Sequence, residues 1–131
     1  MARILIADDS VVIRKTLKKI LLKAGHQVVF EAENGYEAVE GYRKTQPEIV
    51  TMDITMPMMD GIDATEKIAM AYSDAKIVMI SALDEKQKVF EALEKGAKHY
   101  IFKPFNENTV LKIIDVILEY DRISDLDEKL F

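Results

Sequence analysis

The sequence contains no cysteine. Disulfide bonds, a cysteine nucleophile and cysteine-ligated zinc are therefore excluded. It also contains no P-loop and no glycine-rich dinucleotide fingerprint. No apolar run approaches the ~20 residues of a membrane-spanning helix, and the first segment, MARILIADDS, has too short an apolar core for a signal peptide. These absences favour a cytoplasmic protein.

The sequence also has fewer basic than acidic residues. The 18 lysines and arginines are outnumbered by 23 acidic residues, which gives a net charge of −5. A nucleic-acid groove needs a basic patch, and an anionic membrane surface attracts one, so neither partner is expected. The length of 131 residues and the hydrophobic content of 49% suit one domain with a full core.

Short apolar runs alternate with segments of helical periodicity along the whole chain. The runs predict strands at residues 3–7, 27–32, 48–53, 76–81 and 99–102. Helices are predicted from a cap at Ser10 to a stop at Gly25, over about 36–44, from Gly61, over about 84–95 and after Asn106. This alternation predicts an α/β fold: a flavodoxin-like, doubly wound, five-stranded parallel sheet of order 2-1-3-4-5, with helices on both faces.

Polar residues follow the predicted strands where each one ends. The first strand leads into Asp8 and Asp9, and the third, fourth and fifth end in Asp53, Ser81 and Lys103. Any one of these residues alone would be read as a solvated turn, a helix cap or a surface charge. In the predicted strand order all of them meet at the carboxyl edge of the sheet, where open α/β sheets bind ligands.

Three carboxylates in one place repel each other, and a divalent cation removes that repulsion. Oxygen ligands favour Mg²⁺ or Mn²⁺, and His26 and His99 lack metal-ligand spacing. A lysine and a hydroxyl beside such a cation suit the oxygens of a phosphoryl group. Asp53 would then be the nucleophile, since aspartyl phosphates are an established class of covalent intermediate.

Five motifs give the sequence its resemblance to the receiver domain of bacterial response regulators, the CheY-like family. They are ADDS at 7–10, MDITMPMMDGI at 52–62, ISA at 80–82, GA at 96–97 and KPF at 103–105. The resemblance covers about residues 3–118, and the run IVTMDITMP is especially similar to single-domain members of the chemotaxis type. We expect a receiver domain over residues 1–120 and a helical extension or tail over 121–131.

The resemblance implies a role for each matched position of the metal and phosphoryl site. Asp53 matches the phospho-acceptor. Asp9 and Asp53 match direct metal ligands, with the backbone carbonyl of Thr55 as a third, and Asp8 matches an acid that reaches the metal mainly through water. Lys103 matches the lysine that contacts the phosphate, and its bond to Pro104 is expected to be cis.

The resemblance also implies a conformational switch made of Ser81 and Tyr100. From periodicity alone, Tyr100 would be a half-buried strand aromatic. The expected phosphoryl donor is a sensor histidine kinase, and the expected target is a downstream protein that binds the surface of helix four, strand five and helix five. The chain would act as a phospho-acceptor signalling protein, a monomer or weak dimer, that assists its own phosphorylation and dephosphorylation.

Rival functions remain at this point. A haloacid-dehalogenase-like phosphatase also uses a strand-end aspartate, but it carries a second aspartate two residues later, where this chain has Thr55. An FMN binder would cradle phosphate in the loop that holds Asp8 and Asp9, whose charges repel it. The chain could also be the receiver part of a larger DNA-binding regulator. In the tail, Ile123, Leu126, Asp127 and Leu130 have helical spacing, which suggests a contact surface.

Overall fold

The computed structural model describes residues 1–130, and side chains through Ile123. Five parallel strands form one sheet: β1 (Arg3–Ala7), β2 (Gln27–Ala32), β3 (Ile49–Asp53), β4 (Ile77–Ala82) and β5 (His99–Lys103). Their order is β2-β1-β3-β4-β5, as the sequence predicts. The helices are α1 (Val11–Lys23), α2 (Gly35–Thr45), α3 (Gly61–Ala71), α4 (Lys86–Glu94) and α5 (Glu107–Leu130).

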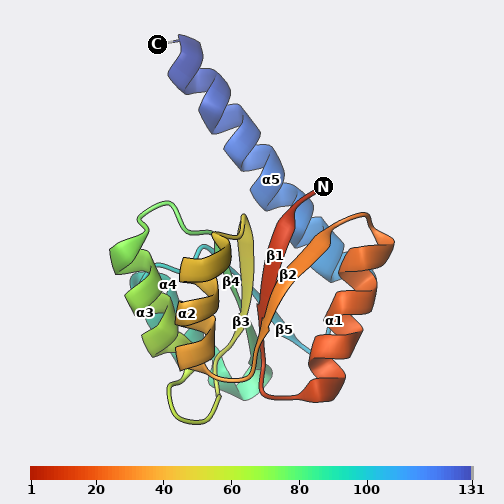
Figure 1. Cartoon of the computed structure of the whole chain (residues 1–131), viewed down its shortest axis with the longest axis vertical. Coiled ribbons are helices and arrows are strands. Elements are labelled where there is room, and N and C mark those ends of the chain that lie inside the picture. The colour runs from red at the N-terminus through yellow and green to blue at the C-terminus, as the bar shows by residue number, and fades with distance from the viewer. Residues whose placement is uncertain (131) are drawn as a thin grey trace.

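The sheet is covered on both faces because side chains alternate along each strand. In β1, Ile4 and Ile6 pack with apolar residues of α1 and α5. Leu5 and Ala7 face the other way, toward α2, α3 and α4. Figure 1 shows the sheet between these two groups of helices. All five residues of β3 are buried, which places the third strand at the centre of the core.

Three helices begin at capping side chains that follow a strand. Ser10, Asn34 and Asp60 each accept a hydrogen bond from the backbone N–H three residues later. Such caps contribute about 1 kcal/mol each, and they start α1, α2 and α3 close to the carboxyl edge of the sheet. The cap at Ser10 was predicted from the sequence.

The helix predicted over about 84–95 differs in its first turn. It begins as a 3₁₀ turn, η1 (Leu83–Glu85), and continues as α4. The backbone N–H of Ala82 donates to the Glu85 carboxylate at 3.0 Å, which stabilises this tight first turn. β4 accordingly extends one residue beyond the predicted end, to Ala82.

α5 continues without a break past Tyr120 to Leu130. Figure 1 shows its last turns leaving the body of the domain at the end opposite the carboxyl edge of the sheet. The predicted stripe reaches Ile123, which is exposed, whereas the side chains of Leu126, Asp127 and Leu130, and Phe131 as a whole, lie outside the described residues. Within the described part of the chain, no helix has the length and apolar character needed to cross a membrane.

Candidate functional site

The three acidic residues predicted at the carboxyl edge come together in the fold. Asp8 and Asp9 follow β1, Asp53 ends β3, and these two strands are neighbours. One carboxylate oxygen from each residue lies within 4.8 Å of the other two. Asp8 and Asp53 are buried, and Asp9 is exposed. The cluster therefore opens to solvent on one side.

Asp8 is held by its backbone and by its side chain. Its N–H donates to the Ala32 carbonyl at 3.0 Å, and its carboxylate accepts from the Ser10 N–H at 2.8 Å. The buried Arg14 donates to the Asp8 carbonyl at 2.7 Å and forms ion pairs with Glu31 and Glu33 at 3.4 and 3.3 Å. Arg14 thus ties the loop after β1 to the segment at the end of β2.

Lys103 bridges two of the carboxylates from the end of β5. Its ammonium lies 3.2 Å from Asp53 and 3.3 Å from Asp8. Burial raises the pKa of Asp53, the Asp8 charge raises it further, and Lys103 offsets only part of this, so the pKa is about 6. Burial lowers the pKa of Lys103, but the charges of Asp53 and Asp8 outweigh it, and the pKa is raised. Asp53 therefore binds a proton more readily than an ordinary aspartate, in spite of the contact with Lys103.

The loop after Asp53 is shaped by Gly61. The Gly61 N–H donates to the Ile54 carbonyl at 2.7 Å. A Cβ atom at residue 61 would lie 1.9 Å from the Asp53 carbonyl oxygen, so any side chain there would displace the strand end. The backbone of Gly61 is thus in close contact with the candidate phospho-acceptor. At the end of β5, the Lys103–Pro104 peptide bond is cis, as expected.

Ser81 lies at the end of β4 with its side chain fully buried. Its hydroxyl has no hydrogen-bond partner among the described residues. A buried polar group without a partner is uncommon in folded proteins. Ile80, the residue before Ser81, pairs with Asp53 across the sheet, so Ser81 lies on the strand next to the candidate phospho-acceptor.

Tyr100 is on the neighbouring strand β5 and is 46% exposed. Its ring lies 5.2 Å from that of Phe102, so both aromatics lie on the same side of the strand. The predicted switch residues are thus placed on two paired strands, with the tyrosine on the outside.

The hydroxyl of Thr55, in the loop after β3, donates to the Glu85 carboxylate at 2.7 Å.

The sequence does not predict two residues that hold the loops around the site, Arg14 and Glu85. An arginine one turn into a surface helix is usually solvated, and nothing in the helical spacing distinguishes Arg14. Glu85 carried a usable signal, because a glutamate three residues after a helix start often accepts a backbone N–H there.

The donor set fits a hard divalent cation. The carboxylates of Asp8, Asp9 and Asp53 provide only oxygen, the ligand type that Mg²⁺ and Mn²⁺ prefer. Burial raises the pKa of Asp53 and the charge of Asp8 raises it further, so the ionised carboxylate is unfavourable there without a cation. Thr55 lies two residues beyond Asp53, on the loop that borders the cluster.

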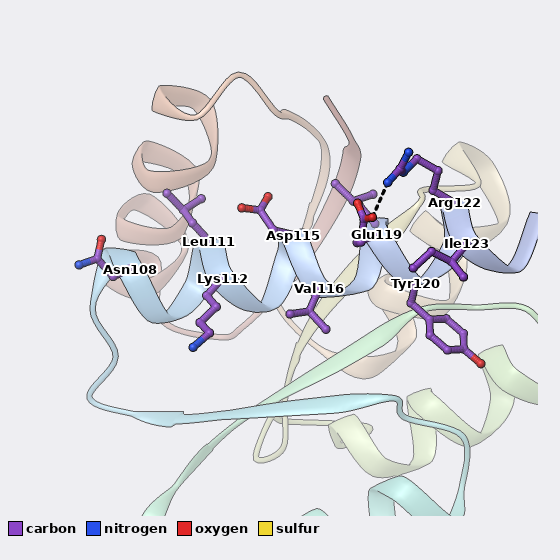
Figure 2. Close-up of a pocket in the computed structure, with 10 residues that line it drawn as sticks. Asn108, Leu111, Lys112, Asp115, Val116, Glu119, Tyr120, Arg122 and Ile123 are labelled. Atoms are coloured by element: carbon purple, nitrogen blue, oxygen red, sulfur yellow. Dashed lines mark hydrogen bonds and ion pairs between the residues drawn. The ribbon is translucent and has the colours of Figure 1, made fainter. Parts of the chain in front are cut away.

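Two hollows lie along α5, away from this cluster. One, of about 1020 Å³, runs beside the outer face of the helix, where Figure 2 shows Val116, Tyr120 and Ile123. The other, of about 500 Å³, lies between α5 and the segment before β4. There Lys76 pairs with Asp121 at 3.5 Å.

Comparison with known proteins agrees with this geometry. The family described as "Response regulator receiver domain" matches residues 4–115. The chain is 48% identical to the chemotaxis protein CheY of Bacillus subtilis over 116 residues, which is 88% of this chain and 97% of that protein. It is 47% identical to CheY of Thermotoga maritima over 115 residues, 88% of this chain and 96% of that protein.

The fold is similar to that of CheY in a crystal structure of a CheX-CheY-BeF₃-Mg²⁺ complex from Borrelia burgdorferi. The TM-score is 0.85 at 40% identity, covering 88% of each chain. The match to NtrX from Brucella abortus has a TM-score of 0.91 at 26% identity and covers 99% of this chain but 29% of NtrX.

A five-stranded sheet with an acidic cluster, a lysine and a hydroxyl at its carboxyl edge defines the class: a signalling receiver domain. The chain belongs to the response regulator receiver domain family, and among its relatives it is of the CheY type.

Proposed function

We propose that this chain accepts a phosphoryl group on Asp53 and passes the resulting change to a partner protein. The observation that carries the proposal is the arrangement around Asp53. Its buried carboxylate lies beside two other acids, Lys103 contacts it at 3.2 Å, and the neighbouring strand β4 carries the Ser81 hydroxyl, which has no partner among the described residues. These groups match the needs of a transferring phosphoryl group, which carries charge on three oxygens.

In the proposed step, a carboxylate oxygen of Asp53 attacks phosphorus. A new O–P bond forms, the bond from phosphorus to the donor breaks, and the donor leaves with the electron pair. The product is an acyl phosphate on Asp53. Lys103 stabilises one phosphoryl oxygen as a point charge, and the Ser81 hydroxyl donates to another.

Asp8, Asp9, Asp53 and the Thr55 carbonyl are proposed to hold Mg²⁺ or Mn²⁺. When bound, the cation neutralises charge on the carboxylates and on the phosphoryl oxygens. The likeness to CheY in a structure that contains Mg²⁺ and BeF₃ supports this assignment.

A haloacid-dehalogenase-like phosphatase fits this site less well. That chemistry needs an acid that activates water two residues after the nucleophile, and Thr55 has none. Its hydroxyl already donates to Glu85. The aspartyl phosphate is therefore proposed to be a signal rather than a turnover intermediate.

The proposed output is a change in the surface formed by α4, β5 and α5. Movement of Ser81 toward the phosphoryl group frees space beside β5, and the exposed ring of Tyr100 turns into it. A downstream protein then binds the altered surface, and a histidine kinase supplies the phosphoryl group. CheY of Borrelia burgdorferi, which is similar to this chain, has been crystallised with CheX, and this supports a protein target.

The test is phosphorylation by a small acyl phosphate, followed by intact mass. The wild-type protein should gain one phosphoryl group with Mg²⁺ or Mn²⁺ present and none in EDTA. Asp53→Asn should gain none, because the nucleophilic oxygen is lost, whereas Asp63→Asn on α3 should behave as wild type. Equal labelling of the Asp53→Asn variant would disprove the proposed acceptor.

A further inference from the structure

Glu85 joins two loops on either side of the candidate phosphorylation site. Its carboxylate accepts from the Thr55 hydroxyl at 2.7 Å and from the Ala82 N–H at 3.0 Å. The first bond spans 30 positions of sequence, so it is a tertiary contact between the β3–α3 loop and the turn η1. The Lys88 ammonium lies 4.0 Å from the same carboxylate.

Both partners of Glu85 are directly connected to the site. Thr55 is two residues from Asp53. Ala82 follows Ser81 in the chain and is paired with Lys103 across the sheet. Burial raises the pKa of Glu85, but the hydrogen bonds from Thr55 and Ala82 outweigh it and keep the pKa below its usual value. The ionised carboxylate is thus the form that makes these contacts.

The Ser81 side chain must move before its hydroxyl can donate to a phosphoryl oxygen on Asp53. In the structure the hydroxyl is fully buried and has no partner among the described residues. Ala82 directly follows Ser81 in the chain, so the bond from the Ala82 N–H to Glu85 restrains the segment that would carry Ser81 toward a phosphoryl group.

We propose that Glu85 is a positioning residue for phosphorylation: together with Thr55 it latches the β4–α4 turn in the unphosphorylated arrangement and opposes the approach of Ser81. This inference rests on the proposed function of Asp53. Release of the latch lowers the cost of the rearrangement, and the transfer step becomes faster.

The kinetic test measures the rate of phosphorylation by a small acyl phosphate in Glu85→Ala, Thr55→Val and the double variant. Both single variants lose the Thr55–Glu85 hydrogen bond, and Glu85→Ala also loses the bond from the Ala82 N–H, so each should react about 2- to 10-fold faster than wild type. The double variant should be no faster than the faster single variant, because there is one latch to lose. Unchanged single-variant rates, or effects that multiply, would overturn the proposal.

Two controls separate the latch from simple charge. Asp84→Ala removes a negative charge from an exposed position on the same turn and should leave the rate unchanged. Glu85→Gln retains an oxygen for the Ala82 N–H and an amide that donates to Thr55, so its rate should stay near that of wild type. Equal acceleration in Asp84→Ala or Glu85→Gln would show an effect of charge and refute the latch.

A second measurement does not depend on phosphorylation at all. Exchange of the Ala82 amide hydrogen, followed by NMR in EDTA, should be faster in Glu85→Ala than in wild type or Asp84→Ala, and faster also in Thr55→Val. If the wild type accepted no phosphoryl group, the proposed function would fail while this readout still tested the latch. Ala82 exchange that is the same in all variants would refute the latch even if phosphorylation occurred.

Discussion

The carboxylate of Asp53 carries an unfavourable charge in the absence of a cation. Burial and the neighbouring Asp8 raise the pKa of Asp53 from an ordinary 3.8 to about 6. Between these pH values the folded protein binds more protons than the unfolded chain. Stability of the metal-free protein therefore falls as pH rises from about 4 to about 6, and the penalty remains at pH 7.

Asp53→Asn should remove that penalty. In EDTA at pH 7 we expect the variant to be more stable than wild type by about 1–3 kcal/mol, since one pKa unit corresponds to about 1.4 kcal/mol. Urea denaturation measures the difference, and Asp84→Asn, which removes an exposed acid, should change little. A less stable Asp53→Asn protein would contradict the inferred cost of the buried Asp53 charge.

His26 has the opposite dependence on pH. Burial lowers the pKa of His26 and the N-terminal charge lowers it further, while Asp115 and Glu48 only partly oppose them. Its Nδ1 accepts the Ala2 N–H at 3.0 Å, which requires an unprotonated nitrogen. The unfolded chain binds more protons just below pH 6.5, so stability contributed by neutral His26 is lost as pH falls through that value.

This dependence is best measured in the Asp53→Asn background, where the titration of residue 53 is removed. Denaturant unfolding between pH 7 and pH 5 should show stability falling with pH, and replacement of His26 by Gln should flatten the slope. A slope that persists unchanged in His26→Gln would assign the effect to another group.

At the residue scale, the sequence located those members of the site that follow strands. Asp8, Asp53 and Lys103 lie together because parallel strands end at one edge, and that edge follows from periodicity. Arg14 and Glu85 could not be found in the same way. Both act on backbone groups across a turn, and such contacts depend on the path of the loop rather than on residue spacing.

At the scale of single elements, the turn between β3 and α3 depends on one missing side chain. Gly61→Ala would put Cβ 1.9 Å from the Asp53 carbonyl oxygen in an unrelaxed backbone. We expect a loss of about 1–3 kcal/mol in stability from this overpacking, together with slower phosphorylation, because the strand end that carries Asp53 must move.

Gly25→Ala is the matched control for that prediction. Gly25 has a φ of +88° and no atom within 4 Å of an added Cβ. Alanine there should cost about 1 kcal/mol through backbone strain and leave the phosphorylation rate unchanged. Unfolding curves and intact-mass kinetics on both variants provide the comparison. Similar kinetic losses in the two variants would mean that the contact at Asp53 has no special role.

Element type and order were predictable because the strands are short apolar runs and the helices have apolar stripes. The start of the fourth helix was not, since a 3₁₀ turn such as η1 has no periodicity of its own to detect. The difference matters for the proposed latch, because η1 contains Glu85 and a regular α-helical first turn would place that carboxylate elsewhere.

At the scale of the whole molecule, α5 is the element that extends beyond the body of the domain (Figure 1). Its first half packs on the sheet through Val110, Ile114 and Ile117. Beyond that, Lys76 and Asp121 form an ion pair, and Tyr120 and Ile123 are exposed. The NtrX match covers 99% of this chain, so a similar path of the chain exists in a longer protein. The candidate phosphorylation site lies at the other end of the sheet.

Deletion of residues 122–131 tests what the end of α5 does. The deletion keeps Asp121 and its pairing with Lys76 and removes no residue of the candidate site. We therefore expect phosphorylation of Asp53 to proceed at the wild-type rate.

We expect self-association or partner binding to weaken, because exposed apolar side chains such as Ile123 are more favourable at a contact than in water. Sedimentation of the full-length and truncated proteins, with and without beryllofluoride and Mg²⁺, measures self-association. A pull-down with both proteins measures partner binding. Ile123→Ser in the full-length chain should reproduce part of the loss, whereas Arg122→Ala, a change on an exposed charged side chain, should not. If the truncated protein matches the full-length one in both assays, the end of α5 is not a contact surface, and the receiver function lies wholly within residues 1–121.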